Sequence, residues 1–192
     1  MDDAMIEIRQ ADKRQAREIA GMIMMAMTDE CCLYFCGEGR GLDDFLEVMT
    51  QLVERDDTQY SYRNTLVAMD DGRLVGAAVS YDGARLHELR QPFIEQAKSR
   101  LGKDHTGMEE ETQAGELYLD SLAVLPEYRR KGIATRLLLA TKKRADALGL
   151  PCVGLLVDTD NPTGEQFYRS IGFRQLNETR FWGGHPMKHM VL

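Results

Sequence analysis

The stretch Leu117–Phe173 reads LYLDSLAVLPEYRRKGIATRLLLATKKRADALGLPCVGLLVDTDNPTGEQFYRSIGF, and it decides the expected fold. Its aliphatic residues up to Val124 predict a strand that Pro126 ends. The basic turn that follows is predicted to open a helix continuing through Leu148. A second strand over Cys152–Val157 and a second helix complete an alternation of strands and helices that is typical of α/β folds.

The turn Arg129–Thr135 has the composition of a phosphate-binding site. A helix start leaves backbone N–H groups unpaired and concentrates partial positive charge. Three cations, Arg129, Arg130 and Lys131, add charge there, and Gly132 lets a ligand approach the backbone closely. We therefore predict a cradle for a diphosphate. The P-loop pattern G-x-x-x-x-G-K-[ST] and the dinucleotide pattern G-x-G-x-x-G do not occur in the sequence, which disfavours both of these folds.

The turn also resembles the signature [RQ]-x-x-G-x-[GA] of the GNAT superfamily of acyl-CoA-dependent N-acyltransferases, here Arg129-Arg130-Lys131-Gly132-Ile133-Ala134. A second motif follows in the family's order. The run NPTGEQFYRSIGF, Asn161–Phe173, is similar to the family's N-x-x-[AG]-x-x-[FL]-Y-x-x-x-G-F. This second match disfavours a nucleotide-phosphate-binding protein of another fold. The resemblance extends to Ile6–Ala20 and Asn64–Tyr81 and is absent over about 83–114.

The resemblance implies an α/β fold (α+β by some schemes) with a mixed, partly splayed central sheet of six or seven strands and flanking helices. It implies acetyl-CoA as co-substrate, with the pantetheine arm between the strands 117–124 and 152–157. A backbone N–H of Val124 or a neighbour would polarise the thioester carbonyl. Cofactor contacts are expected from Leu122, Ala123, Val124, Arg129, Arg130, Lys131, Gly132, Ile133, Ala134, Thr135, Asn161 and Tyr168.

Transfer to a primary amine needs a base, because an amine with a pKa near ~10.4 is protonated at neutral pH. Glu116 and Asp120 share a strand face with Tyr118 by period-two alternation, so either carboxylate, directly or through water, is a candidate. Asp120 lies closer to the cradle, and Glu116 lies nearer the expected acceptor end.

The resemblance assigns Tyr168 as the general acid that protonates the leaving thiolate. A phenol with a pKa of about ~10 donates to a thiolate of about ~8.5 with a modest disadvantage. Some family members carry a carboxylate on the second strand, but the matching position here is Leu156, which weakens the case for a protein N-terminal acceptor.

Composition limits the partners and the location. The 192 residues, 43% of them hydrophobic, are enough for one core, and we expect a single domain over 1–192. The net charge of -7 argues against nucleic acid and suggests a cationic acceptor such as a polyamine, an amino sugar or a lysine-like amine. No apolar run approaches the ~20 residues that span a bilayer, and the N-terminus has no leader pattern. We expect no membrane partner, a cytoplasmic location, and a monomer or homodimer.

The sequence has no C-x-x-C pair among its four cysteines, which are Cys31, Cys32, Cys36 and Cys152. His185 and His189 lie four apart in a stretch expected to be extended. We therefore expect free thiols and no metal. No cysteine lies beside a convincing histidine base, which favours direct transfer over a covalent acyl-enzyme.

The first half of the chain alternates in the same way. Strands are predicted over Met5–Arg9 and, as a hairpin around Asp71-Gly72, over Thr65–Asp70 and Leu74–Tyr81. Helices are predicted after the cap Asp12 and over Leu42–Arg55.

The segment of about 83–114 is expected to be an insertion that contains a helix and a loop. The helix is predicted over Leu86–Leu101, with Pro92 in its first turn or starting a new helix, and a mobile polar loop over Gly102–Ala114. This insertion is either a wall of the acceptor site, with Glu109, Glu110 and Glu111 favouring a cation, or surface decoration.

Taken together, these features predict an acetyl-CoA-dependent N-acetyltransferase that acts on a primary amine of a small molecule. Two alternatives remain. A protein or peptide amine acetyltransferase would have an open, shallow cleft, and a non-catalytic acyl-CoA-binding module is disfavoured by Tyr168.

Overall fold

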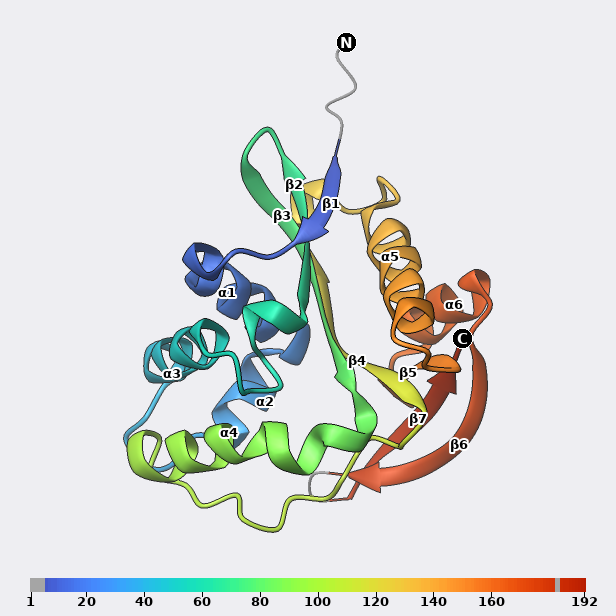
Figure 1. Ribbon diagram of the computed structural model, residues 1–192. Helices are drawn as coiled ribbons and strands as arrows, with labels where there is room; N and C mark the ends of the chain where they lie inside the picture. Colours follow the sequence, from blue (N-terminus) through green and yellow to red (C-terminus); the bar gives the residue numbers. More distant parts are fainter. Residues whose placement is uncertain (1–5, 182–183) are drawn as a thin grey trace.

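A seven-stranded sheet in the order β1-β2-β3-β4-β5-β7-β6 forms the centre of the protein (Figure 1). The computed structural model describes residues 6–181 and 184–192. All neighbouring strands are antiparallel except β4 and β5, which are parallel. The strands are β1 Glu7–Gln10, β2 Thr65–Asp70, β3 Arg73–Asp82, β4 Glu116–Val124, β5 Cys152–Asp158, β6 Arg174–Phe181 and β7 His185–Val191.

The parallel strands β4 and β5 pair over three residues only, from Glu116 opposite Cys152 to Tyr118 opposite Gly154, and then diverge. The expectation of a mixed, partly splayed sheet is therefore confirmed. The register between β3 and β4 also shifts, because Val79 lies opposite Ser121 while Ser80 lies opposite Leu119. Asp120 is thus the extra residue of a β-bulge, placed where the two parallel strands begin to separate.

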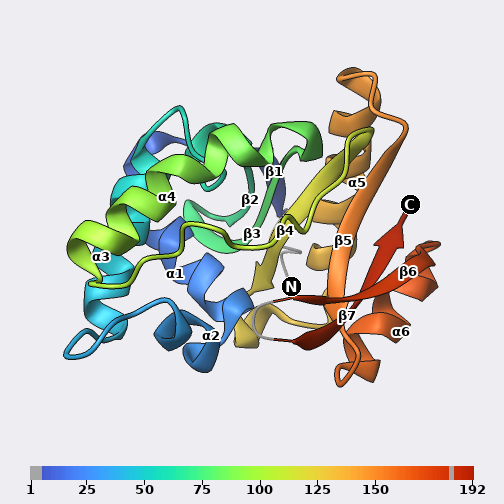
Figure 2. The ribbon, with the colours of Figure 1, turned by 90° about the horizontal axis from the view of Figure 1, so that it is seen from below.

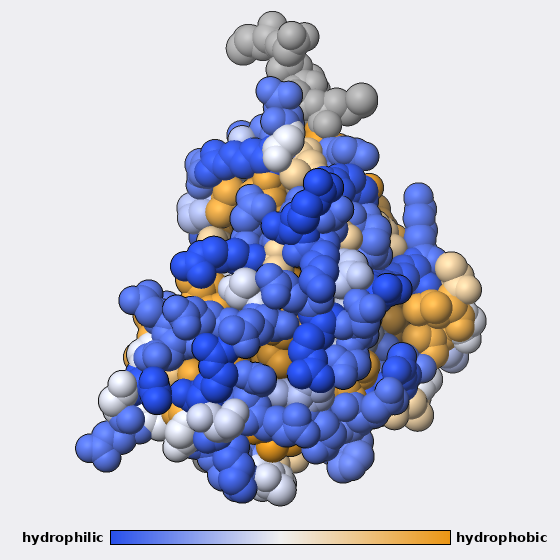
Figure 3. Space-filling model, turned by 60° about the vertical axis from the view of Figure 1, so that its left-hand side comes forward, coloured by the Kyte–Doolittle hydropathy of each residue, from blue (hydrophilic) through white to orange (hydrophobic). Residues whose placement is uncertain are grey.

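Helices cover both faces of the sheet (Figures 1 and 2). One face carries α1 Ala16–Met27, α2 Asp29–Tyr34, α3 Leu42–Glu54 and α4 Leu86–Arg100, and the other carries α5 Ile133–Ala147 and α6 Pro162–Ile171. Fully buried side chains fill both layers, with Ile19 and Phe45 on the first face and Leu117, Leu137 and Val153 on the second. The surface seen over the first face is mostly hydrophilic (Figure 3).

Several predicted elements differ in detail from the structure. Asp12 caps a 3-10 turn, Lys13–Gln15, that leads into α1, and the short helix α2 was not predicted. Strand β1 begins at Glu7, whereas the predicted start, Met5, lies outside the described residues. The helix predicted from Arg129 begins instead at Ile133.

The helix of the insertion runs through Pro92, which was predicted to lie in a first turn or to start a new helix. Pro92 is the seventh residue of α4, so the helix accepts the loss of one backbone hydrogen bond at this buried position. The loop after α4, which was predicted to be mobile, contacts the rest of the protein at several points. His105 and Glu111 are buried there, and the Thr112 hydroxyl donates to the Gly83 carbonyl at 2.6 Å.

Among residues 6–181 and 184–192, no helix combines the length and the apolar character needed to cross a membrane.

Candidate active site

A cleft of about 650 Å³, within the usual range for small-molecule sites, lies between the end of β4, the start of α5, the end of α1 and α6, on the side where β5 has diverged from β4. Its walls include all the predicted cofactor residues except Lys131 and Asn161. Sequence reasoning missed the other lining residues, which come from the end of α1, the turn after β4 and the start of α6: Met25, Ala26, Tyr128, Thr163 and Phe167.

The backbone of the basic turn is shaped as an anion cradle. Gly132 adopts φ 75°, a left-handed conformation that glycine reaches without strain, and Arg130 has φ 61°. The first intrahelical donor of α5 is the Arg136 N–H, which bonds the Gly132 carbonyl at 3.0 Å. The N–H groups of Ile133, Ala134 and Thr135 precede it, and in an α-helix such groups have no intrahelical partner. Ile133, Ala134 and Thr135 line the cleft, and N–H groups at a helix start suit an anion.

The side chains of the turn differ in what they contact. Arg129 Nε donates to the Val124 carbonyl at 3.2 Å and so ties the turn to the end of β4. Lys131 Nζ lies 4.7 Å from the centre of the Tyr128 ring. Arg129, Arg130 and Lys131 are all exposed, so their positive charge faces solvent at the mouth of the cleft.

Strand β4 also directs backbone donors into the gap. The Leu125 N–H donates to the Val75 carbonyl of β3 at 2.9 Å. Because the N–H groups of a strand alternate in direction, those of Leu122 and Val124 point away from β3, toward the side where β5 has diverged. These two donors line the cleft where a thioester carbonyl is expected.

Tyr168 reaches the cleft from the opposite wall, on α6. Asn161 caps this helix, with its Oδ1 accepting the Gly164 N–H at 2.9 Å. The Tyr168 ring lies 5.4 Å from the Phe167 ring and 5.5 Å from the Phe173 ring. Burial raises the pKa of Tyr168 to about 12, so the phenol stays protonated, and able to donate a hydrogen bond, throughout the neutral range.

Both carboxylate oxygens of Glu116, one of the two candidate bases, are engaged in contacts with other residues. Its Oε2 lies 2.7 Å from His189 Nε2, and its Oε1 accepts the Gln113 N–H at 2.9 Å. The Gln113 amide nitrogen donates to His189 Nδ1, which leaves the ring proton on Nε2, facing Glu116. A Cβ on Gly154 would lie 1.9 Å from Glu116 Oε2, so only glycine leaves room for this carboxylate. The side chain lies where β4 and β5 are still paired.

Asp120, the other candidate, lies at the bulge, two residues before Leu122. Its Oδ1 accepts from the Ser121 hydroxyl at 2.9 Å, and its Oδ2 accepts from the Tyr81 hydroxyl at 3.2 Å and Gln59 Nε2 at 3.3 Å. Burial raises the pKa of the Asp120 carboxyl above its ordinary value, and the three hydrogen bonds offset part of that rise. Neither carboxylate lines the cleft, whose β4 wall begins at Leu122, but Asp120 is the nearer of the two along the strand and follows the point where β4 and β5 stop pairing.

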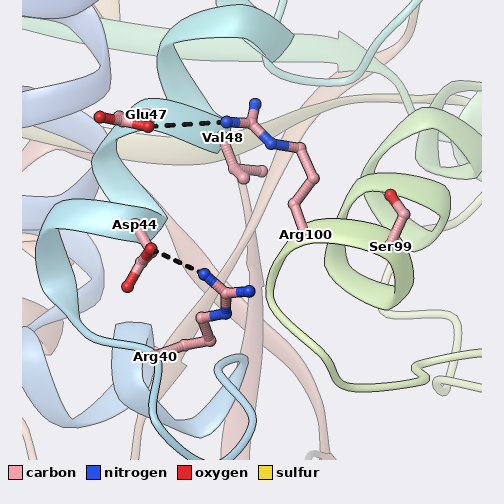
Figure 4. A pocket seen from close by; sticks show the side chains of 6 residues that line it. All are labelled: Arg40, Asp44, Glu47, Val48, Ser99 and Arg100. Atoms are coloured by element: carbon pink, nitrogen blue, oxygen red, sulfur yellow. Dashed lines mark hydrogen bonds and ion pairs between the residues drawn. The ribbon is translucent and has the colours of Figure 1, made fainter.

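A second, smaller cavity of about 280 Å³ lies between α3 and α4 (Figure 4). Two ion pairs span its wall, Arg40 with Asp44 at 3.3 Å and Arg100 with Glu47 at 3.5 Å. All the predicted functional residues lie elsewhere, and both arginines already have carboxylate partners. The cleft between β4 and β5 is therefore the candidate active site.

In the described part of the chain, no group of three or more His, Cys, Asp or Glu side chains could hold a metal ion. The four cysteines are free thiols.

The parallel strands β4 and β5 that diverge, and the basic turn before α5, agree with the fold that the sequence resemblance implies. The model of the Acetyltransferase (GNAT) family matches residues 40–173, well over half of the sequence, and the chain therefore belongs to this family.

Solved structures agree with this assignment of the fold. The chain is similar to the crystal structure of an acetyltransferase with 27% sequence identity and a TM-score of 0.79, over 96% of this chain and 97% of that one. It is also similar to an N-acetyltransferase from Staphylococcus aureus Mu50, with 21% identity, a TM-score of 0.78, and coverage of 97% and 100%. The aminoglycoside N-acetyltransferase AAC(6')-Iy in complex with CoA shares 17% identity and a TM-score of 0.58, over 93% of each chain. No curated protein matches the sequence.

Proposed function

We propose that the protein transfers an acetyl group from acetyl-CoA directly to a primary amine of a small molecule. The observation that carries this proposal is the order of groups along strand β4 and the turn after it. The basic turn and the backbone donors of Leu122 and Val124 line the cleft, and Asp120 lies two residues before Leu122, where β4 and β5 have stopped pairing.

The residues present fit acetyl-CoA. The N–H groups of Ile133, Ala134 and Thr135 and the exposed cations of the turn suit a diphosphate, which is bound well at a helix N-terminus. The outward-facing N–H groups of Leu122 and Val124 suit the amides and carbonyls of a pantetheine arm. When bound, acetyl-CoA supplies an acetyl group activated as a thioester.

Asp120 removes a proton from the amine, so that the nitrogen lone pair is free to attack. Its raised pKa makes it a stronger base than an ordinary aspartate, which reduces the mismatch with an ammonium of pKa near ~10.4. The N–H groups of Leu122 and Val124 stabilise the negative charge that develops on the carbonyl oxygen. Glu116 stabilises the paired ends of β4 and β5 through its contact with His189.

Tyr168 acts on the leaving sulfur as a hydrogen-bond donor. Complete proton transfer from a phenol of pKa about 12 to a thiolate whose thiol has a pKa of ~8.5 would be uphill by about 5 kcal/mol. A hydrogen bond stabilises the thiolate without that cost. Solvent takes the second proton from the acetylated nitrogen and protonates the departing thiolate.

A small-molecule acceptor is supported by the burial of the side chains around Asp120. Tyr81 and Tyr118, beside it, are 2% and 4% exposed, whereas a protein or peptide acceptor calls for an open, shallow cleft. The similar aminoglycoside N-acetyltransferase also has a small-molecule acceptor by its name.

The test is a screen of primary amines with acetyl-CoA, in which release of the CoA thiol is measured, together with calorimetry of CoA binding. We expect micromolar-range CoA binding, typical of a cofactor site of this size, and amine-dependent thiol release. CoA binding without thiol release for any amine would make the protein a binding module and refute the proposal. Release that occurs only with peptides would assign it to the protein-modifying alternative.

A further inference from the structure

A buried polar cluster lies on the α4 side of strand β4, and it is assembled from segments far apart in the sequence. We call it the Asp120 cluster. Its members come from the loop after α3, from β3, from α4, from the loop that follows α4, and from β4: Gln59, Tyr60, Tyr81, Arg90, Glu111 and Asp120. The first half of α4 runs beside the ends of β3 and β4 that carry the cluster (Figures 1 and 2).

Helix α4 connects the two halves of this cluster. The Gln59 N–H donates to the Leu89 carbonyl at 3.0 Å, which fixes Gln59 beside the next residue of the helix, Arg90. The Arg90 guanidinium pairs with Glu111 and also donates to the Glu109 carbonyl at 3.0 Å. The insertion thus carries Arg90 and Glu111 into the interior, behind Asp120.

The charges of the cluster do not balance. Arg90 and Glu111 are 4% and 6% exposed, and their ion pair cancels their charges within the interior. Asp120 receives hydrogen bonds only from neutral groups, the hydroxyls of Ser121 and Tyr81 and the Gln59 amide. Asp120 therefore has no cationic hydrogen-bond partner, and Arg90, which also acts on it electrostatically, is shared with Glu111.

An unsatisfied acceptor lies next to that charge. Gln59 is 3% exposed, and within the described residues its Oε1 has no hydrogen-bond partner; in the same cluster Arg90 Nε also has none. The same amide group donates through Nε2 to Asp120 Oδ2, so Oε1 lies close to the carboxylate. Buried acceptors without a partner are uncommon and costly, which indicates that a donor is missing here. A primary ammonium has three N–H donors and can bond both Asp120 and Gln59.

The walls around the cluster are apolar and aromatic. One buried group consists of Tyr81, Leu86, Leu89 and Tyr118, and the partly buried side chain of Leu156 of β5 packs against it. At Leu156, where some family members have a carboxylate, this chain offers only an aliphatic surface. Nothing in this wall would match a second positive charge on the acceptor.

We propose that Asp120 and Gln59 together receive the acceptor nitrogen, and that the acceptor is a primary amine with one positive charge and an apolar body. This inference rests on the proposed function. It differs from what net charge alone suggests, since an acidic protein favours a polyamine or an amino sugar. The carboxylate that could have matched a second cation, Glu111, is already used by Arg90.

The first arm of the test compares three amines with the wild-type protein: 2-phenylethylamine, with one charge and an aromatic body; 1,4-diaminobutane, with two charges; and spermidine, with three. We expect kcat/KM for 2-phenylethylamine to exceed both others at least about tenfold, because each extra ammonium must be desolvated without a partner. A preference for the diamine or for spermidine would overturn the inference while leaving the proposed function intact.

The second arm replaces Gln59 by methionine, which has a similar volume and no amide. We expect the KM for 2-phenylethylamine to rise about tenfold, the size expected for one lost hydrogen bond to a charged group, with unchanged CoA affinity. Gln96→Met is the matched control, because Gln96 in α4 also has a buried Oε1 without a partner but is not part of the cluster. Its KM should stay at the wild-type value.

The outcomes separate the two proposals. An unchanged KM in Gln59→Met, or an equal rise in both variants, would refute the role of Gln59. If no amine is acetylated although CoA binds, the proposed function itself fails. If Gln59→Met does not fold, as shown by loss of CoA binding, the wild-type comparison of the three amines still decides the acceptor class.

Discussion

The two ends of the proposed site are built in different ways. The cofactor end is one continuous piece of chain, from Leu122 to Thr135, in which Arg129, Arg130 and Lys131 are exposed while Ala123, Val124 and Ile133 are buried. The acceptor end is assembled from five separate segments, and its residues Gln59, Arg90 and Glu111 are at most 6% exposed. The proposal therefore places cofactor binding on a local motif. It places acceptor recognition on residues that only the tertiary fold brings together.

Because the two ends are built from different residues, a substitution at one end should impair the function of that end and leave the other unaffected. Substitutions at the acceptor end should change turnover or acceptor KM and spare CoA binding. Substitutions in the basic turn should do the reverse.

The largest effect is expected for Asp120→Asn, which removes the base. Turnover should fall by about 10²–10⁴-fold, the usual contribution of a group that transfers a proton, with CoA affinity unchanged. Because burial raises the pKa of Asp120, the acid limb of the wild-type kcat/KM profile should lie above the ordinary aspartate value of ~3.9 and should be lost in the variant.

The matched control is Glu116→Gln, which removes a buried carboxylate from the same strand. Here we expect loss of the contact with His189 and a lower free energy of unfolding, by about 1–3 kcal/mol, with turnover close to wild type. Both variants are compared at a temperature where both are folded. If Glu116→Gln loses as much turnover as Asp120→Asn, the assignment of Asp120 as the base and of Glu116 as a structural residue is wrong.

A smaller effect is expected for Tyr168→Phe. Loss of a hydrogen bond to a charged sulfur, worth about 1.5–3 kcal/mol, should lower turnover roughly 10–100-fold at constant CoA affinity. Since the pKa of Tyr168 is about 12, the wild-type rate should show no alkaline limb from this residue below pH 10. Wild-type turnover in the variant would leave Tyr168 with a packing role only.

The cofactor end is tested by Gly132→Glu, measured by calorimetry of CoA binding. A side chain at φ 75° is strained, and its carboxylate would repel the diphosphate, so CoA should bind at least about tenfold more weakly. Gly39→Glu is the control, because Gly39 has the same φ of 75° in an open loop between α2 and α3. Equal loss of CoA affinity in both variants would mean that strain, and not the cradle, is responsible.

The smallest effect concerns stability. The pKa of Asp120 is raised in the folded protein, so ionised Asp120 lowers stability at neutral pH, and this cost disappears as the pH falls below the ordinary aspartate value. Asp120→Asn should therefore have a higher midpoint of thermal unfolding than wild type at pH 7, with the difference shrinking toward pH 4. A lower midpoint at pH 7 would show that the carboxylate is stabilising and contradict the raised pKa.

The elements that could be predicted from the sequence have local signals. The hairpin of β2 and β3 follows from Asp71-Gly72, and β4 and the basic turn follow from the aliphatic run and the cations after it. The start of α5 was predicted too early, because the left-handed backbone at Arg130 and Gly132 keeps the turn out of the helix until Ile133.

The remaining features depend on contacts between distant residues. The bulge at Asp120 interrupts the alternation that the prediction assumed for β4, and the partner of Glu116 is His189, at the far end of the chain. Gln59 carries no sequence signal, since a single glutamine in a polar loop is ordinary. The pairing of Arg90 with Glu111 depends on how the insertion folds back, and no periodicity encodes it.

The most direct test of acetyl transfer is to follow a carbon-13-labelled acetyl group by mass spectrometry, using labelled acetyl-CoA and the fastest amine of the screen. The proposed function predicts labelled N-acetylamine in an amount equal to the CoA released, with wild-type protein and not with Asp120→Asn. Labelled acetate in place of the amide would contradict it, because the cleft would then deliver the acetyl group to water.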